Sequence, residues 1–568
     1  MISVTGIFLY MLITCYLLGF GCYELLAGFR RKQEKALHEE PLHEEPHRTW
    51  TGCVYAGVAF TVFYAQIFSV FYKVGFLANV LLLILAAAGV IFYRDRFAEE
   101  LKRLWNQRNI KRAMVYALLF LLYTYGTSRG IEHYDTGLYH AQSIRWIEEY
   151  GVIRGLGNLH SRLAYNSAAF PWTALYSFRF LGGQSFHCGA GFLAWLLSVV
   201  CVSRFWEKGS RRFRLSDFAR VMAAYYLFNI FDEMISPASD YFMVLLVFYV
   251  VIRWLMLVED GVTDYFPYAM LCVLGVTILT MKLSGAVILL LVWYPAIQMI
   301  RQKRWKETGC FLLTGFLTAL PYFIRNVLLS GWLVYPFTSI DLFDLPYKIP
   351  KGAAEYDARE IKVWGRGYSD VTRYGEGITE WFPDWFRSLS LTDKGFFLLA
   401  VSGLVLLIGI VLGTLIRKKK DQLPVLFSVG VVNVCFVFWM ATSPLVRYGC
   451  VFLWLTAVLD WGYVYVTWIQ RFDRGRIAFL FLILLGIYKA GALGIENVRS
   501  FTPEYFVKQK DYEHFDTIAY DMHGYTFYYP KEGDRTGYDA FPAAPWQKED
   551  ILIGETIQEG LSDDGKNR

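Results

Sequence analysis

Residues 395–416 read GFFLLAVSGLVLLIGIVLGTLI and are followed at once by Arg417, Lys418, Lys419 and Lys420. A run of about 20 apolar residues is long enough for a helix to cross the hydrocarbon core of a bilayer. Lysines and arginines directly after such a run mark the cytoplasmic side of the membrane. This stretch therefore predicts a membrane-spanning helix that ends in the cytoplasm, and the rest of the chain can be compared with it.

The composition of the whole chain agrees with that prediction. Its 568 residues are 55% hydrophobic, 18% aromatic and only 19% charged, whereas soluble domains carry about 25% charged residues. Disorder, a disulfide scaffold and an ordinary soluble enzyme are therefore excluded. The nine cysteines lie mostly in apolar runs without a CxxC motif, and we interpret them as small buried hydrophobic residues. The expected fold class is an all-α polytopic membrane protein.

About 14 apolar segments are candidates for membrane-spanning helices. The segments 113–128 and 217–232 are the shortest, and the long apolar stretch 265–300 is divided near Lys282. The candidate spans are residues 2–29, 50–70, 73–93, 113–128, 184–203, 217–232, 240–258, 265–281, 283–300, 308–329, 395–416, 423–441, 447–469 and 475–493.

Basic residues orient these spans. With the boundaries above, every loop that is rich in lysine and arginine falls on one side, which we predict to be cytoplasmic. These loops are 30–32, 94–112, 204–214, 301–304, 417–420 and 471–476. The opposite, extracytoplasmic side then carries residues 129–183, 233–239, 330–394 and 442–446, together with the tail from 494. We expect the chemistry on this side of a plasma membrane.

The chain is expected to divide into three parts. Residues 1–110 form N-terminal transmembrane helices with a cytoplasmic linker at 30–49, in which 37–46 repeat Leu-His-Glu-Glu-Pro twice. Residues 111–493 form a transmembrane core with external loops at 129–183 and 330–394. Residues 494–568 are a polar and aromatic extracytoplasmic tail. Within the first loop, residues 143–150 have the pattern of a short amphipathic helix.

The segment 131–145, IEHYDTGLYHAQSIR, carries the largest number of chemically versatile side chains. A helix that begins near Asp135 places Asp135 and Tyr139 on one face, because they are four residues apart. His140 and Arg145 follow. A carboxylate at the membrane surface beside a histidine is well placed as a general base. The alternative is that Asp135 or Thr136 only caps the helix.

Three carboxylates crowd the second external turn, since residues 231–240 read FDEMISPASD. The negative charges of Asp232, Glu233 and Asp240 repel one another unless a cation lies beside them. Asp240 could instead cap the helix that follows. The turn therefore predicts either a cationic partner from elsewhere in the chain or a helix cap.

Basic residues stand at the external ends of three later spans. Lys282 lies between two strongly apolar runs, where a charge is costly and indicates function, unless it only extends to the membrane surface. Arg325 and Arg447, the latter followed by Tyr448, lie on the side that the positive-inside rule disfavours. Guanidinium groups bind phosphate bidentately. Together these cations predict a phosphate clamp, or alternatively salt bridges to loop carboxylates.

This combination resembles the GT-C superfamily of integral membrane glycosyltransferases, which includes protein O-mannosyltransferases and aminoarabinose transferases. The likeness covers roughly residues 110–450. It rests on the many spans, on Tyr134-Asp135 with Tyr139-His140 in the first large external loop, on the acidic turn 232–240 and on basic residues at later helix ends. Many relatives carry Asp-Glu in the first loop, whereas Thr136 follows Asp135 here. Glu132, Asp232 or Glu233 are the candidates for a second carboxylate.

The resemblance implies a glycosyltransferase that uses a polyprenyl-phosphate sugar and a glycan, lipid or protein acceptor, with no role for nucleic acid. Asp135, Asp232 and Glu233 would be catalytic. A divalent cation, Mg or Mn, is an open option, although no residue is assigned as its ligand. Aromatic residues of the second large loop could stack on sugars or anchor the loop at the interface. The substrate-binding candidates are Tyr139, His140, Arg145, Asp240, Lys282, Arg325, Arg447 and Tyr448, and the aromatic ones are Trp364, Tyr368, Trp381 and Trp385.

Two other functions share these features. A transporter or flippase for lipid-linked glycans also needs polar groups along a membrane path, although it would typically show related repeats and charges in both halves. A polymerase of lipid-linked glycans would use the same compartment and the same lipid. The arrangement in space separates these options, because a transferase requires Asp135, the 232–240 carboxylates and Arg447 to meet.

Overall fold

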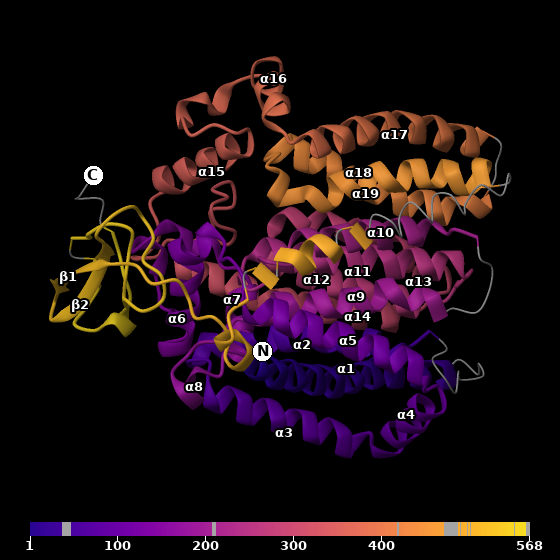
Figure 1. The fold of residues 1–568 in the computed structure, drawn as a ribbon, viewed down its shortest axis with the longest axis horizontal. Helices are drawn as coiled ribbons and strands as arrows, with labels where there is room; N and C mark the ends of the chain where they lie inside the picture. Colours follow the sequence, from indigo (N-terminus) through magenta and orange to yellow (C-terminus); the bar gives the residue numbers. More distant parts are fainter. Residues whose placement is uncertain are drawn as a thin grey trace.

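The computed structural model describes residues 1–36, 47–206, 212–416, 420–470, 487–488, 490–496, 498–499, 501–549 and 551–563. Long helices lie side by side in one bundle (Figure 1). The repeated pentapeptide at 37–46 and most of the expected span 475–493 lie outside the described residues. The bundle helices are α1 (Ile2–Ala36), α2 (Trp50–Phe71), α3 (Phe76–Phe92), α4 (Arg94–Asn106), α5 (Ile110–Ser128), α9 (Gly189–Ser203), α10 (Leu215–Asn229), α11 (Ser239–Glu259), α12 (Tyr265–Met281), α13 (Trp293–Arg301), α14 (Trp305–Ser330), α17 (Leu391–Ile416), α18 (Leu423–Thr442) and α19 (Val446–Val464).

The apolar helices make the chain a polytopic membrane protein. Nine helices in the described residues are long and apolar enough to span a bilayer, or ten if α3 and α4, which meet at 88°, count as one. Helix α12 is apolar but has only 17 residues, and α5 and α10 do not meet the same criterion. The expected all-α polytopic class is confirmed, whereas the number of about 14 spans stays a prediction.

The two ends of the bundle differ in what they carry (Figure 1). One end, called the cap end here, bears the short helices α6 (Ala141–Glu149), α7 (Ala169–Leu175) and α8 (Arg179–Gly182), then α15 (Lys351–Gly365) and α16 (Ile378–Ser388). The expected amphipathic helix at 143–150 corresponds to α6. The other end, called the basic end, bears α4 and the end of α13, with their lysines and arginines.

The tail folds against the cap end. After α21 (Glu504–Val507), strands β1 (Thr517–Met522) and β2 (Tyr525–Pro530) pair antiparallel in a hairpin. The backbone amides of Thr536 and Gly537 both donate to the carbonyl of Gly137, at 3.0 and 2.8 Å. The Met1 amino group contacts the carbonyl of Tyr505, so the N-terminus lies beside the tail at this end. The tail is therefore an ordered cap over the first large loop.

Helix packing places the centre of the bundle at α11 and α19. In the most apolar window of each helix, 83% of α11 and 78% of the α19 segment are buried, compared with 22% of α17. Small residues allow α1 and α2 to cross closely, since a Cβ on Gly57 would lie 1.7 Å from the carbonyl oxygen of Cys15. The central helices α11 and α19 begin at the cap end, which brings their first residues together there.

Candidate functional site

Four segments that are far apart in the chain bring charged side chains together at the cap end. We name this group the cap-end cluster: His133, Asp135, Asp240, Lys282, Arg447 and Tyr448. Arg447 bridges two carboxylates, because its Nη2 lies 3.0 Å from Oδ2 of Asp135 and its Nε lies 3.3 Å from Oδ2 of Asp240. Lys282 pairs with the other oxygen of Asp240. The cluster therefore links the first loop to α11, α12 and α19.

Tyr448 supports both cations. Its ring centroid lies 4.0 Å from Nζ of Lys282 and 5.3 Å from the Arg447 guanidinium carbon, within the range of cation–π attraction. Ser284 donates to the Tyr448 carbonyl at 3.0 Å. At Gly449, a Cβ would lie 2.4 Å from the Trp439 ring, so only glycine lets this ring pack against the start of α19. These contacts fix the direction of Arg447.

The loop that carries Asp135 is tied to the second external turn. The amide of Ile131 donates to the Asp232 carbonyl at 2.8 Å, and the amide of His133 donates to Ser236 Oγ at 2.7 Å. Gly130 has φ +128°, and a Cβ there would lie 2.3 Å from the Asp232 oxygen. The close approach therefore requires glycine at this position.

Neither clustered carboxylate caps a helix. The π-helical turn η1 (Thr136–His140) follows Asp135 without a capping hydrogen bond from its side chain. Helix α11 has Ala238 at its N-cap position and no side-chain cap. The capping alternative for Asp135 and Asp240 is therefore wrong, and both face cations from distant helices instead.

The electrostatic environment keeps Asp135 ionised. Burial raises the pKa of Asp135, but Arg447 and the two neighbouring histidines outweigh burial, so the pKa lies below its ordinary value. Burial and the nearby Arg447 charge lower the pKa of His133. Burial lowers the pKa of His140 to about 3. At neutral pH Asp135 is therefore ionised, whereas the imidazoles of His133 and of the neighbouring His140 are neutral.

Tyr139 and His140 lie beside the cluster. Their ring centroids are 4.4 Å apart, and both side chains are buried. Burial, followed by the charges of Asp135 and Asp240, raises the pKa of the Tyr139 phenol well above its ordinary value. Thr136 Oγ1 lies 3.4 Å from Nδ1 of His140. Both predicted residues are therefore neutral neighbours of the charged groups.

Other predicted site residues have separate partners. Asp232 pairs with Arg129, and Glu233 accepts a hydrogen bond from the Tyr241 hydroxyl. Burial raises the pKa of Asp232 even though Arg129 opposes this. The structure does not bring these two carboxylates into contact with Arg447 or Lys282, because their own neighbours engage them.

Glu132, the further candidate for a second carboxylate, lies beneath the tail. Its Oε1 is 3.5 Å from Nε2 of His187, and its other oxygen accepts from the Glu513 amide at 3.2 Å. Burial raises the pKa of Glu132 to about 7. Asp240, rather than Glu132, is the second carboxylate beside Asp135.

The structure does not bring Arg325 to the predicted phosphate clamp, and the tail engages Arg145, which was a separate substrate-binding candidate. Arg145 Nη1 donates to the carbonyls of Tyr538 and Asp539, both at 2.6 Å, because the tail docks on α6. Arg325 is buried beside α2, where it donates to Asn166 Oδ1 at 2.9 Å and to Ser69. Each guanidinium is used to hold the fold together.

Sequence reasoning did not single out His133 or Arg162. The His133 ring accepts from Arg447 and lies 3.7 Å from Asp135. Arg162 stacks on Trp364 at 4.5 Å. His133 lies in the quoted segment 131–145, so its proximity in the chain was a signal. Arg162 gave none, since it stands alone in a loop.

The four predicted aromatic residues of the second large loop have three different surroundings. Trp381 and Trp385 are buried, and Trp385 Nε1 donates to the Pro444 carbonyl at 2.8 Å, so they pack α16 against the bundle. Tyr368 is stacked by Arg373 at 3.4 Å. Trp364 instead lines a cavity under the tail.

The residues of the cluster do not fit a divalent cation. Within the described ranges, no group of three or more His, Cys, Asp or Glu side chains is arranged to hold a metal ion. Asp135 and Asp240 form ion pairs with Arg447 and Lys282, whose positive charges already balance those of the two carboxylates. A cation at this point would compete with two side-chain cations.

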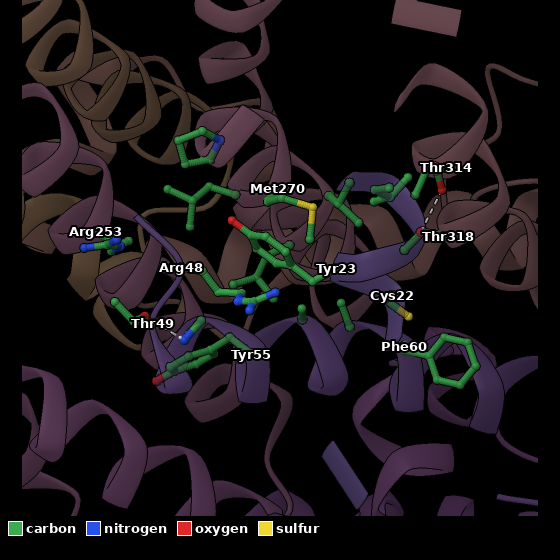
Figure 2. Close-up of a pocket in the computed structure, with 18 of the residues that line it drawn as sticks. Cys22, Tyr23, Arg48, Thr49, Tyr55, Phe60, Arg253, Met270, Thr314 and Thr318 are labelled. Carbon is green, nitrogen blue, oxygen red and sulfur yellow. Dashed lines mark hydrogen bonds between the residues drawn. The ribbon is translucent and has the colours of Figure 1, made fainter. Parts of the chain in front are cut away.

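A second cavity lies nearer the basic end, apart from the cap-end cluster (Figure 2). It encloses about 300 Å³ between α1, α2, α11, α12 and α14, and its lining is mostly apolar. Arg253 of α11 borders it and donates to the His47 carbonyl at 2.6 Å. Arg48 also lines it but pairs with Glu24 and Glu100. This cavity suits an apolar chain better than polar chemistry.

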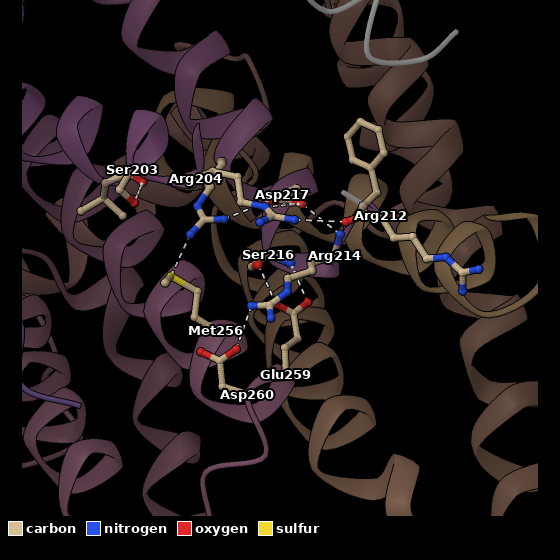
Figure 3. Close-up of polar contacts among 12 residues, drawn as sticks. Ser203, Arg204, Arg212, Arg214, Ser216, Asp217, Met256, Glu259 and Asp260 are labelled. Carbon is tan, nitrogen blue, oxygen red and sulfur yellow. Dashed lines mark hydrogen bonds and ion pairs between the residues drawn. The ribbon is translucent and has the colours of Figure 1, made fainter. Parts of the chain in front are cut away.

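A second polar group, the basic-end network, is formed by Arg204, Arg214, Ser216, Asp217, Arg220 and Glu259. Figure 3 labels all of these residues except Arg220. Asp217 pairs with Arg204 at 3.0 Å and with Arg220 at 2.8 Å, and it accepts from the Arg214 amide at 2.9 Å. Glu259 accepts from the amide and the hydroxyl of Ser216, at 2.9 and 2.6 Å. The network therefore ties the start of α10 to α9 and α11.

The fold and the cluster together define a polytopic α-helical membrane protein with a charged site beneath an ordered C-terminal cap. A family model described as "Domain of unknown function (DUF8201)" matches residues 1–454, and the chain belongs to this family. The match includes every residue of the cap-end cluster. Comparisons with curated proteins and with solved structures gave no match.

Proposed function

We propose that this protein is a membrane glycosyltransferase that moves a sugar from a polyprenyl-phosphate donor to an acceptor hydroxyl. The observation that supports the proposal is the Arg447 bridge between Asp135 and Asp240, with Lys282 beside it. The four residues come from separate segments, and neither carboxylate caps a helix. Burying charges at such a place costs free energy. Binding of a phosphate-bearing substrate explains why the chain nevertheless places charges there.

The proposed reaction assigns a role to each side. The donor phosphate binds Arg447 and Lys282, which draws Arg447 away from Asp135. Losing this cation raises the pKa of Asp135 and makes it a stronger base. Asp135 then takes the proton of the acceptor hydroxyl as its oxygen attacks the anomeric carbon. The bond from that carbon to the phosphate oxygen breaks with inversion, and its electron pair leaves with the lipid phosphate.

The proposal places the cap end on the extracytoplasmic side of the plasma membrane. Its support is the positive-inside rule, since the described basic residues of α4 and of the end of α13 lie at the other end. A GT-C-like core with about 14 spans belongs to the same proposal. The acceptor is a glycan, a lipid or a protein at that face, reached through the loops and the tail.

A transfer assay tests this function directly. The purified full chain in nanodiscs is incubated with a panel of polyprenyl-phosphate sugars and acceptors, and release of free polyprenyl phosphate is measured. We expect release with at least one donor and none from empty nanodiscs. Absence of release from every donor, while the protein stays folded by thermal unfolding, contradicts the proposal.

One observation favours transport of lipid-linked glycans as a second candidate. The apolar cavity near the basic end borders Arg253 (Figure 2), and a charge at this depth is costly without a role. A transporter needs lipid access from both leaflets. Movement of a labelled polyprenyl-phosphate sugar across proteoliposomes, without sugar transfer, would support this candidate over the transferase.

A further inference from the structure

A cavity of about 480 Å³ lies between the first large loop, α15 and the tail. Leu138 of η1 lines it, three residues after Asp135. On the other sides it is bordered by Trp364 of α15 and by Trp546 of the tail. Its volume falls within the range of about 300–1,000 Å³ that small-molecule sites occupy. The cavity is therefore large enough for sugar rings and adjoins the cap-end cluster.

Two charged side chains in this cavity, Arg162 and Glu360, make no hydrogen bond or ion pair with the described residues. Arg162 stacks on Trp364 at 4.5 Å. Burial raises the pKa of the Glu360 carboxyl, although Arg162 opposes this. Half-buried polar groups without partners cost free energy. A ligand that offers both donors and acceptors would satisfy the guanidinium and the carboxylate together.

Aromatic surfaces line the same cavity. Trp546 and Tyr356 are 53% and 54% exposed, so a ligand in the cavity can reach their rings. The Trp546 ring is held edge-to-face by His160 at 5.8 Å, and Lys548 lies 5.8 Å from its centroid. Flat rings that are fixed but open to solvent suit the C–H face of a sugar, which carries slight positive charge.

The charge of the cavity excludes anionic ligands. It holds four carboxylates, Asp357, Glu360, Asp534 and Asp563, and two cations, Arg162 and Lys548. Burial lowers the pKa of His160 to about 3, so this imidazole adds no charge at neutral pH. Two negative charges are left over and repel phosphates and acidic chains. Net charge alone does not disfavour a basic peptide, and the open Trp546 and Tyr356 rings are the feature that favours a sugar.

We propose that this cavity binds a neutral oligosaccharide, which serves as the acceptor of the transfer reaction. The acceptor role rests on the proposed function, whereas the binding of sugar does not. Trp364 and Trp546 pack against sugar rings, and Glu360 and Arg162 bond their hydroxyls. The terminal residue of the glycan extends past Leu138 toward Asp135.

Saccharide binding without donor tests this inference. Chitohexaose, mannohexaose and cellohexaose are titrated against the full chain in nanodiscs, with ligand-observed NMR and calorimetry. We expect at least one to bind, and we expect Trp546→Ala and Glu360→Gln to weaken its binding at least about tenfold, because each removes a principal contact. Asp135→Asn keeps the binding, since Asp135 does not line the cavity.

Two control variants match the chemistry elsewhere. Trp105 of α4 also carries a stacked arginine, with Arg108 at 3.9 Å, and Glu355 lies on the same helix as Glu360 without lining the cavity. Trp105→Ala and Glu355→Gln should leave binding unchanged. The inference is overturned if none of the three saccharides binds, if a basic peptide binds instead, or if the cavity variants bind as well as the controls. Binding without transfer from any donor would remove the proposed function and the acceptor role but keep the sugar site.

Discussion

The cap-end cluster and the basic-end network both gather acids and bases, but they are built differently. In the basic-end network Asp217 and Arg220 are one helical turn apart, and Arg204 lies only 13 residues earlier. In the cap-end cluster Asp135 and Arg447 are separated by 312 positions in the chain and meet through tertiary packing alone.

The carboxylates also differ in what they do for the backbone. Asp217 and Glu259 accept hydrogen bonds from backbone amides at the start of α10, which satisfies helix donors that would otherwise lack partners. Asp135 and Asp240 cap nothing. The basic-end network is thus explained by helix-end stability, whereas the charges of the cap-end cluster require a different reason. In the proposed function, a substrate phosphate and an acceptor hydroxyl supply that reason.

Removing Asp217 gives the largest effect and tests the structural half of the comparison. Asp217→Ala takes away the carboxylate that Arg204 and Arg220 share, which should cost about 3–5 kcal/mol of unfolding free energy. The midpoint of thermal unfolding of the purified protein measures this loss. Sugar transfer per folded molecule should stay the same.

Asp260→Ala is the control for that variant. Asp260 pairs with Arg214 at 2.8 Å, but its side chain is 42% exposed, so its loss should cost no more than about 1 kcal/mol. Equal destabilisation by the two variants would show that Asp217 is not the centre of the network.

Changing Arg447 to lysine gives a smaller effect than the loss of Asp217. Lysine keeps the charge but cannot bridge Asp135 and Asp240 in the same way, because it lacks the planar fork. We expect KM for the lipid donor to rise about tenfold or more, with a smaller change in kcat. Steady-state kinetics over a range of donor concentration measure the two constants. An unchanged KM would show that Arg447 does not bind the donor phosphate.

The acid limb of the pH–rate profile gives the smallest effect. In the free protein Arg447 holds the pKa of Asp135 below its ordinary value, so kcat/KM should fall only below the usual carboxyl range. In Arg447→Gln the cation is lost, the pKa of Asp135 rises, and the limb should move up by about one pH unit or more. A limb at the same pH in both proteins would mean that Asp135 does not control the rate.

Local sequence patterns were sufficient to predict the elements whose formation depends on neighbouring residues in the chain. Continuous apolar runs predicted the long helices, and the amphipathic pattern of 143–150 predicted α6. Charge at the end of a span, where it is costly, pointed to Lys282 and Arg447 before any contact was known. Helix α12 is shorter than a full span, and the more polar α5 and α10 do not meet the criterion of length and composition for a span.

Partners could not be predicted in the same way, because they depend on which helices pack together. Nothing in the sequence pairs Asp240 with Lys282. Arg325 matched the pattern of a phosphate ligand, and Arg145 was a candidate for substrate binding. The tail uses Arg145 through its backbone carbonyls, and carbonyl oxygens leave no mark on the sequence. Arg325 likewise donates to Asn166, a partner that only tertiary packing brings within reach.

The most direct test of the account is the effect of Asp135→Asn on transfer and on stability together. The variant leaves Arg447 paired with Asp240, so the midpoint of thermal unfolding should shift by no more than about 2 °C. The transfer rate should fall at least about 100-fold, because the general base is lost. Asp370→Asn, an exposed aspartate of the cap end, should retain the full rate. Full transfer by Asp135→Asn, or a loss of transfer that only follows a loss of folded protein, would contradict the account.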